Sequence, residues 1–453
     1  MSRKTAFVGF SYMAGLLLAS FFSAPLSIAI GAVLLGFGLC TVFIFRPKHS
    51  GSFYRSAVCA IACCVGLWIY NGYDMTVCRN ITANIGNFSG TVTIEQSTVY
   101  SEEKAFYIAH CTFPNGASGN VGFFDRRSDL VKGDKITLSG QLYAPENTGF
   151  FNSADYYRSM NVFLLMKSVR TSGYEIKEHN FYRTLDDFRH NVSDTIRKYV
   201  PSEEGELLIG MLFGSSKWNM SDRTENLLYR AGIGHVAAVS GLHMSVAAGI
   251  AAALAIALRL PKWGQFISVT AVSLLFAMTA GFTPSVVRSL IMVMFVWAAG
   301  IFNRRSDSLT SLAAAIIIMT ISSPFIVRST SFLLSVSGTI GTAVLSPMFI
   351  NAYEKKMERK TDLPYHVGAL SSALCSSLCA AAAVFPVSAL TFDQISIASP
   401  LTNLLLSPLC TAAIAIAAIG ALLCILPFTF ISGGLFLAAG LICRPILAVA
   451  KLI

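Results

Sequence analysis

Charge is scarce in this chain of 453 residues, and that scarcity limits the class of protein it can be. Only 13% of the residues are charged and 54% are hydrophobic, whereas a soluble globular domain carries about a quarter charged residues. The composition excludes an ordinary soluble protein, and we expect most of the chain to lie in lipid. Only the polar region between residues 75 and 232 is expected to fold in water around a hydrophobic core.

Signatures of a motor, a metal site and a secretory signal are also missing. The chain has no Walker A pattern, so we expect any motor to be another protein. It has no cysteine spacing typical of a metal site, and we expect neither a metal nor another cofactor. The N-terminus has no convincing small-residue cleavage site after an apolar stretch, so we do not predict a cleavable signal peptide.

Cysteine is nearly absent from the polar region. Nine of the eleven cysteines lie in apolar runs, where cysteine acts as a small hydrophobic residue. Only Cys78 and Cys111 lie in the polar region, which we expect outside the membrane, where oxidation is possible. We predict one disulfide between them, with two separate thiols as the alternative.

Acidic residues are rare outside the polar region, although the net charge of the whole chain is +10. Residues 75–233 hold 17 basic and 18 acidic side chains, whereas the rest of the chain holds 17 basic and only 6 acidic ones. The basic residues of the apolar part cluster between apolar runs, as in EKKMERK at 354–360. This is the pattern of the positive-inside rule, so the charge predicts topology and does not by itself indicate a nucleic-acid partner.

The apolar runs predict a polytopic α-helical membrane protein with about eleven transmembrane segments. Three crossings precede the polar region, and a basic N-terminus on the inside places that region outside the membrane. The expected segments are 6–23, 26–45, 56–73, 234–258, 264–282, 285–302, 309–327, 331–350, 366–391, 398–425 and 429–450. Because the last two contain prolines, re-entrant segments are the alternative for them.

Five stretches of the polar region are rich in β-forming residues and predict a small extracytoplasmic β-barrel of the OB type. The stretches are 89–96, 104–113, 120–124, 133–143 and 161–169. From about residue 182 the pattern becomes helical, with Ser202 and Ser221 as expected N-caps. The predicted division is therefore N-terminal transmembrane segments (1–74), an OB-like β domain (75–180), an amphipathic helical linker (181–233) and a second transmembrane domain (234–453).

The stretch GHVAAVSGLHMS at 234–245 places small and polar residues at the start of an apolar segment. His235 and His243 are eight residues apart, about 80° around an ideal helix, so they share a face only if the helix is broken. Ser240 and Gly241 form the expected break. A plain helix entry at the membrane surface is the alternative, and for His235 alone we favour it. For the whole set we favour a functional site.

The stretch AGFTPSVVRSL at 280–290 places Arg288 inside another apolar segment, after a turn marked by Pro284. An arginine at membrane depth needs a partner, water or an anionic ligand. An arginine that snorkels to the membrane surface is the alternative. Because this segment and the segment that begins at Gly234 both open to the outside, we predict that they line one vestibule.

These two stretches resemble the signature of the ComEC competence proteins, which are inner-membrane channels for DNA uptake. Other stretches resemble further parts of that family in the same order: GDKITLSGQLY at 133–143, GFFNSADYYRSMNV at 149–162, LLIGMLFGSS at 207–216 and SIASPLTNLLLSPL at 396–409. Many members continue into a metallo-β-lactamase-like domain with an HxHxDH motif, which this sequence lacks. The chain thus resembles a short form, and a separate nuclease is the expected source of any strand-degrading activity. Ala237 and Ala238 stand where the family often has larger apolar residues.

The resemblance implies a channel, not an enzyme, that carries single-stranded DNA across the cytoplasmic membrane during natural transformation. It implies that residues 234–453 form the channel domain. The expected DNA-binding and pore residues are His235, Ser240, Gly241, His243, Ser285, Arg288 and Arg230. The near-neutral external domain indicates that a separate DNA receptor at the cell surface captures DNA. A cytoplasmic DNA-translocating ATPase is the expected motor, and membrane lipid is the expected surrounding.

Two other functions are open. Ser240 within AVSGLH could act as the nucleophile of an intramembrane serine hydrolase, activated by a histidine. Against this function, Ala238 stands where a GxSG motif has its first glycine, and His243 is only three residues from Ser240. A small-solute transporter could use the broken segment as its binding site, but the sequence shows no inverted repeat.

Overall fold

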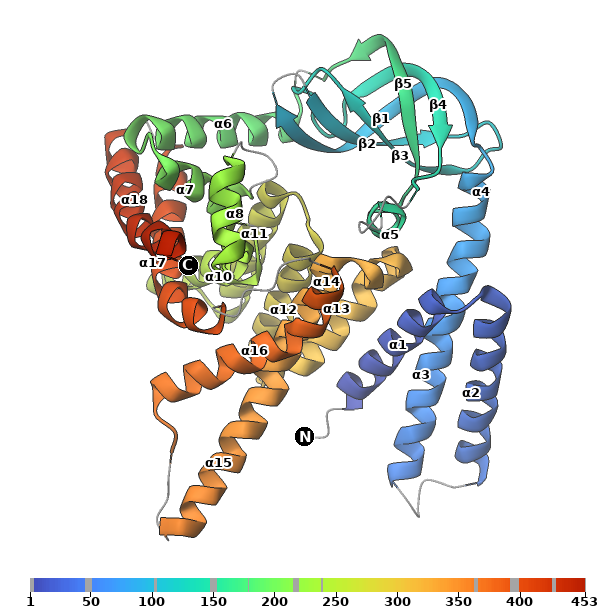
Figure 1. Cartoon of the computed structure of the whole chain (residues 1–453), viewed down its shortest axis with the longest axis vertical. Coiled ribbons are helices and arrows are strands. Elements are labelled where there is room, and N and C mark those ends of the chain that lie inside the picture. Colours follow the sequence, from blue (N-terminus) through green and yellow to red (C-terminus); the bar gives the residue numbers. More distant parts are fainter. Residues whose placement is uncertain are drawn as a thin grey trace. The chain divides into compact units, whose positions relative to one another are not determined.

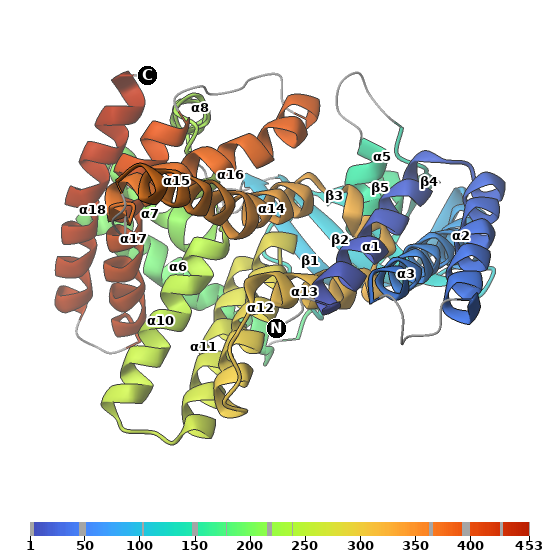
Figure 2. The same cartoon turned by 90° about the horizontal axis from the view of Figure 1, so that it is seen from below.

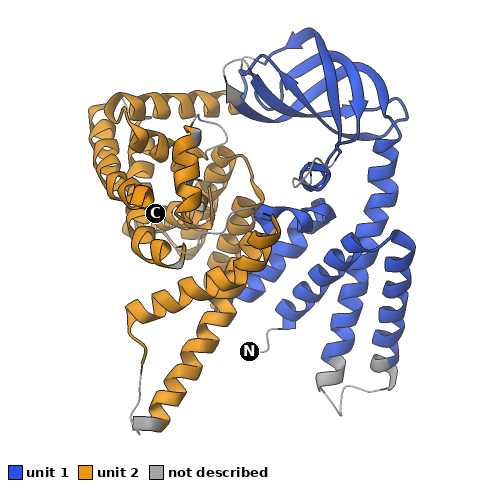
Figure 3. Cartoon of the chain, in the orientation of Figure 1, with its two compact units in different colours: residues 1–180, 305–332 blue, residues 181–304, 333–453 orange. Residues whose placement is uncertain are grey.

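The chain folds into two compact units, which a computed structural model describes over ten stretches of sequence. The described residues are 4–44, 51–101, 104–146, 153–177, 179–214, 220–237, 239–361, 366–391, 399–425 and 429–452. Unit 1 comprises residues 1–180 and 305–332, and unit 2 comprises residues 181–304 and 333–453 (Figure 3). The four domains predicted from the sequence stay a prediction, because the boundaries of the two units differ from the predicted domain boundaries. Residues 305–332 fall in the predicted second transmembrane domain but pack in unit 1.

Unit 1 begins with three apolar helices. They are α1 (Lys4–Phe21), α2 (Ala24–Ile44) and α3 (Gly51–Tyr73), and α3 continues through the π-helical turn η1 (Asp74–Cys78) into α4 (Arg79–Thr82). Helices α1 and α3 pack backbone against backbone, because a Cβ atom on Gly15 would collide with the carbonyl oxygen of Cys63, and one on Gly66 with that of Tyr12. Small residues at a helix contact allow this close approach in a membrane protein.

Five strands of unit 1 form a closed barrel in the order β1-β2-β3-β5-β4 (Figure 1). The strands are β1 (Gly86–Ser101), β2 (Lys104–Thr112), β3 (Ser118–Asp125), β4 (Lys135–Tyr143) and β5 (Val162–Glu175). Only β3 and β5 pair in parallel, and β1 pairs with β4 to close the barrel. Alternate apolar side chains such as Ile94, Ile136 and Phe123 fill its interior. The prediction of a five-stranded barrel is confirmed; its place outside the membrane stays a prediction.

The segment that returns to unit 1 joins the barrel to the helices. It contains α13 (Ser308–Ser322) and the 3-10 turn η3 (Pro324–Arg328), which contacts the short helix α5 (Ser153–Ser159). Arg328 forms an ion pair with Asp155 of α5 at 2.7 Å. The buried ring of Phe325 meets Tyr70 of α3 and Phe163 of β5 edge to face. The barrel and α5 therefore contact the η3 turn, whose residues lie more than 140 positions later in the sequence.

The predicted disulfide between Cys78 and Cys111 is wrong, because both cysteines are free and buried. Cys78 ends the π-helical turn below the barrel, and Cys111 lies on β2. Burial raises the pKa of the Cys111 thiol to about 12, and only the thiolate reacts readily. Each of these two side chains therefore serves as a small apolar group in the core.

Unit 2 is entirely helical over its described residues. Its helices are α6 (Phe181–Tyr199), α7 (Glu203–Phe213), α8 (Asp222–Arg230), α9 (Gly234–Ala237), α10 (Gly241–Ala257), α11 (Lys262–Ala280), α12 (Pro284–Ile301), α14 (Thr330–Ile340), α15 (Ser346–Thr361), α16 (Ala369–Thr391), α17 (Ser399–Leu423) and α18 (Thr429–Leu452). Helix α14 begins in the last residues of unit 1 and continues through the π-helical turn η4 (Gly341–Leu345) into α15. Ser202 and Ser221 are the N-caps of α7 and α8, as predicted.

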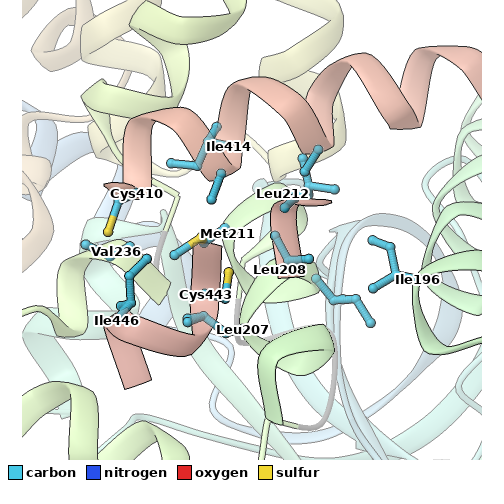
Figure 4. Close-up of a cluster of buried hydrophobic side chains, with 14 of the residues drawn as sticks. Ile196, Leu207, Leu208, Met211, Leu212, Val236, Cys410, Ile414, Cys443 and Ile446 are labelled. Carbon is cyan, nitrogen blue, oxygen red and sulfur yellow. The ribbon is translucent and has the colours of Figure 1, made fainter. Parts of the chain in front are cut away.

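The largest core of unit 2 lies where α6 and α7 pack against α17 and α18 (Figure 4). Leu208 and Met211 of α7 meet Ile414 of α17 and Cys443 of α18 in this core. Ion pairs lie beside it, between Glu204 and Arg444 at 3.5 Å and between Glu203 and Lys451 at 2.7 Å. The described residues of the amphipathic segment 181–233 therefore pack as part of the helical unit.

Eleven apolar helices account for the eleven predicted segments. Among the described residues, eight helices are long and apolar enough to cross a membrane, and three shorter apolar helices accompany them (Ala24–Cys40, Gly241–Ala257 and Ser308–Ser322). Helices α17 and α18 each run without interruption through a proline, 25 and 24 residues long. The multi-pass character is thus supported, and the number of crossings stays a prediction.

Candidate functional site

The helix break predicted at Ser240 and Gly241 separates α9 from α10. Ser240 has an extended backbone and is the N-cap of α10, which begins at Gly241. The backbone N–H of Ser240 donates to Nδ1 of His243 at 3.1 Å, and the Ser240 hydroxyl lies 3.0 Å from the same nitrogen. His243 is only 1% exposed. An Nδ1 that accepts a hydrogen bond places the proton of the neutral ring on Nε2. The imidazole thus holds the polar end of α10 in place.

Arg288 lies one turn inside α12. Helix α11 ends at Ala280, and its C-cap Gly281 has a left-handed φ of 82°. Pro284 occupies the first turn of α12, where a missing N–H costs nothing. Arg288 is 7% exposed, and its guanidinium donates to the hydroxyl of Thr339 on α14 at 2.9 Å. Its other contacts are the Met292 sulfur at 3.1 Å and the Ser289 hydroxyl at 3.3 Å.

No carboxylate of the described residues pairs with Arg288, and its Nε atom has no hydrogen-bond partner among them. Its neighbours are a thioether and two hydroxyls, which carry no charge. A buried cation without a counter-ion is costly, because neutral groups compensate only part of its lost hydration. The site is therefore suited to an anion that the described residues do not supply.

Gly241 brings the two polar segments together. Helices α10, α11 and α12 lie side by side (Figure 2). A Cβ atom on Gly241 would lie 2.8 Å from the Ser289 hydroxyl oxygen and 3.3 Å from Nη2 of Arg288. Beside this contact lies an open cavity of about 470 Å³ between α10 and α12, and its lining residues Ser245 and Val296 are exposed. Its lining residues are Gly241, Ser245, Ala248, Gly249, Arg288, Ser289, Met292, Val293, Val296 and Trp297.

Four of the other predicted site residues, Ser240, His243, Ser285 and Arg230, do not line this cavity. Ser240 and His243 lie at the α10 end next to it, and the Ser285 hydroxyl faces that of Ser335 at 3.2 Å. Arg230 is exposed in the last turn of α8. The backbone of His235 lies in α9, and its side chain is outside the described residues.

Several residues of the site were missed by the sequence reasoning. Ser245 and Gly249 follow Gly241 at intervals of four, so they share its helix face, and this spacing was a readable signal. Ser289 was visible next to Arg288 in the same motif. Thr339 lies 51 residues from Arg288 and gave no signal, because only the packing of α14 against α12 brings it near.

Together, these features define a class: a multi-pass helical membrane protein that carries a five-stranded barrel and a buried cation with no counter-ion among the described residues. A family model described as "Competence protein" matches residues 211–453. The chain therefore belongs to the competence protein family. It is also 24% identical over 285 residues to "ComE operon protein 3" of Bacillus subtilis (strain 168); the match covers 62% of this chain and 35% of that protein. The search of solved structures gave no significant match.

Proposed function

We propose that this chain is a channel that carries single-stranded DNA across the cytoplasmic membrane during natural transformation. Membership of the competence family supports a role in DNA uptake. The observation that carries the proposal is Arg288, a buried cation beside a cavity, without a carboxylate partner among the described residues. A strand passing through a membrane needs cationic groups for its phosphates and apolar or aromatic surface for its bases, and both line this cavity.

The site suits a strand in transit more than a strand held tightly. One arginine neutralises one phosphate, so a phosphate could leave as the next one arrives. Conduction in general needs sites that bind weakly enough to release. Ser240 and His243 fix the start of α10. Gly241 has no side chain, so the backbone of α10 can lie close to Arg288.

The proposed division of labour needs other proteins. A cell-surface receptor would capture DNA, because the barrel region is nearly neutral. A cytoplasmic ATPase would pull the strand, and a separate nuclease would remove the complementary strand. The barrel would lie outside the membrane.

The Ser240–His243 contact also supports an intramembrane serine hydrolase as a second candidate. The hydroxyl is 3.0 Å from Nδ1, within the reach of a nucleophile and its base. The backbone N–H of Ser240 also occupies that nitrogen, which favours a capping role. A fluorophosphonate probe decides between them: labelling of wild type but not of Ser240→Ala would establish the hydrolase, and the channel proposal predicts no labelling.

The test of the channel is uptake of labelled transforming DNA in a host whose own copy is deleted. We compare wild type with Arg288→Ala and Ser240→Ala, and use Arg223→Ala, an exposed arginine of α8, as the matched control. Membrane abundance is checked by blot. Loss of one charge-assisted contact is expected to lower uptake about tenfold or more for Arg288→Ala, whereas Arg223→Ala stays near wild type.

Two results would contradict the proposal. Wild-type protein that inserts correctly but fails to restore DNA entry, with the motor, the receptor and a nuclease present, would exclude the channel. Normal uptake by both Arg288→Ala and Ser240→Ala would leave the channel in place but remove this cavity from its path.

A further inference from the structure

The cavity between α10 and α12 has two chemically different ends. Ser245, Arg288 and Ser289 surround one end, and Val296 and Trp297 surround the other. Its volume of about 470 Å³ lies within the range of about 300–1,000 Å³ that is typical of small-ligand sites. The cavity therefore suits a unit of the size of one nucleotide, with a charged part and a flat apolar part.

The polar end of the cavity, around Arg288, is suited to bind an anion. Arg288 is 7% exposed, its Nε atom has no hydrogen-bond partner among the described residues, and its guanidinium lines the cavity. Its hydrogen bonds to Thr339 and Ser289 orient the guanidinium without neutralising it. A phosphodiester oxygen supplies the missing charge and accepts from a planar guanidinium in good geometry.

The other end holds the one aromatic ring among the residues that line the cavity, Trp297. Its ring packs against the alanine face of α10, where Ala248, Ala251 and Ala252 are buried. The same side chain also lines the cavity. Trp297 follows Arg288 by nine residues, which is about 13 Å along the helix axis.

We infer that this cavity holds one nucleotide of a single strand at a time, with its phosphodiester on Arg288 and its base stacked on Trp297. This inference rests on the proposed function and adds to it a base platform, by which we mean the Trp297 ring on which a base stacks. Stacking is independent of sequence, because every base has a π-face. A cation without a platform would hold any phosphodiester, including that of a phospholipid headgroup, so the platform is what makes this a nucleotide site.

The experiment measures binding of two labelled 20-mers to the purified full chain in nanodiscs by fluorescence anisotropy. One oligomer is oligothymidylate, and the other has the same backbone without bases. Stacking predicts that wild type binds the first about tenfold more tightly than the second. Trp297→Leu should bind the two equally, and Trp297→Phe should keep most of the preference. The matched control is Trp263→Leu, which changes a tryptophan of α11 that is 58% exposed and lies away from the cavity lining.

Arg288→Gln separates the phosphate contact from the base contact. It should weaken binding of both oligomers to a similar degree and reduce the slope of log affinity against log salt by about 0.7. Native mass spectrometry of wild type and Arg288→Gln in the same nanodiscs reports bound phospholipid.

Each outcome has one meaning. Wild type that binds neither oligomer contradicts the proposed function, and the inference with it. Wild type that binds both equally, or a Trp297→Leu variant that keeps the preference, overturns the base platform and leaves the channel standing. A phospholipid that is lost in Arg288→Gln while oligomer binding is unchanged would identify the cavity as a lipid headgroup site and overturn the inference.

Discussion

At the scale of the residue, Gly241 sets how closely α10 approaches α12. The Ser289 hydroxyl donates to the Ser285 carbonyl at 2.8 Å and lies 3.3 Å from Nη2 of Arg288. A Cβ atom on Gly241 would come within 2.8 Å of that hydroxyl oxygen. Any side chain at this position must therefore displace the group that orients Arg288.

Gly241→Ala is expected to lower the free energy of unfolding by about 1–3 kcal/mol, the usual cost of overpacking, and to weaken oligonucleotide binding. The control is Gly300→Ala in the last turn of α12, where a Cβ atom meets nothing within 4 Å. Helix propensity predicts that this control is neutral or stabilising by up to about 1 kcal/mol. Thermal unfolding in detergent and anisotropy measure both effects, and a neutral Gly241→Ala would show that the contact is loose.

At the scale of the element, a buried arginine joins α6 to the end of α11. Arg189 donates through Nη2 to the carbonyl of Met278 at 2.8 Å and also to that of Thr279. These carbonyls belong to the last turn of α11, which has no intrahelical donors for them. Burial lowers the pKa of Arg189, and the neighbouring carboxylate of Asp186 raises it. The contact fixes the turn that leads into the helix of Arg288.

Arg189→Met keeps the apolar stem but removes the donors, and we expect it to cost about 2–3 kcal/mol of stability. Arg197→Met on the same helix is the matched control, because that side chain is 52% exposed and its ion pair with Asp194 is at 3.5 Å. An exposed pair contributes about 0–1 kcal/mol. Chemical unfolding followed by tryptophan fluorescence gives both values, and equal effects of the two substitutions would refute the capping role.

At the scale of the whole molecule, the charge distribution predicts on which side of the membrane each region lies. The barrel region is nearly neutral, whereas EKKMERK at the end of α15 is strongly basic and is expected inside. Arg126 after β3 and Lys356 on α15 are both exposed. A label at Arg126 therefore tests the predicted outer side of the membrane, and a label at Lys356 tests the predicted inner side.

A membrane-impermeant maleimide should label Arg126→Cys in intact cells, and Lys356→Cys only after permeabilisation. Wild type gives the background from its native cysteines, of which Cys78 and Cys111 are buried. The reverse pattern would invert the topology, and labelling of both variants in intact cells would contradict the predicted orientation of α15.

Much of the fold followed from local patterns. The five strands begin and end within a few residues of the predicted stretches, except that β1 and β5 extend further, to Ser101 and Glu175. Period-two alternation identifies a strand wherever one face is buried, but it weakens at strand ends outside the barrel core. The helix break at Ser240 was also readable, because serine and glycine both favour a helix start over a helix interior.

The sequence by itself determined which segments are apolar, where the barrel lies along the chain and which two polar motifs matter. These properties depend on side-chain chemistry within about ten residues. Only the tertiary structure decided that residues 305–332 pack in unit 1, that Cys78 and Cys111 form no disulfide, and that Thr339 orients Arg288. Such contacts join residues that are far apart in the sequence, through the packing of helices. In a bilayer, a helix face that contacts lipid and one that contacts another helix are both apolar, so the sequence pattern does not show which helices pack together.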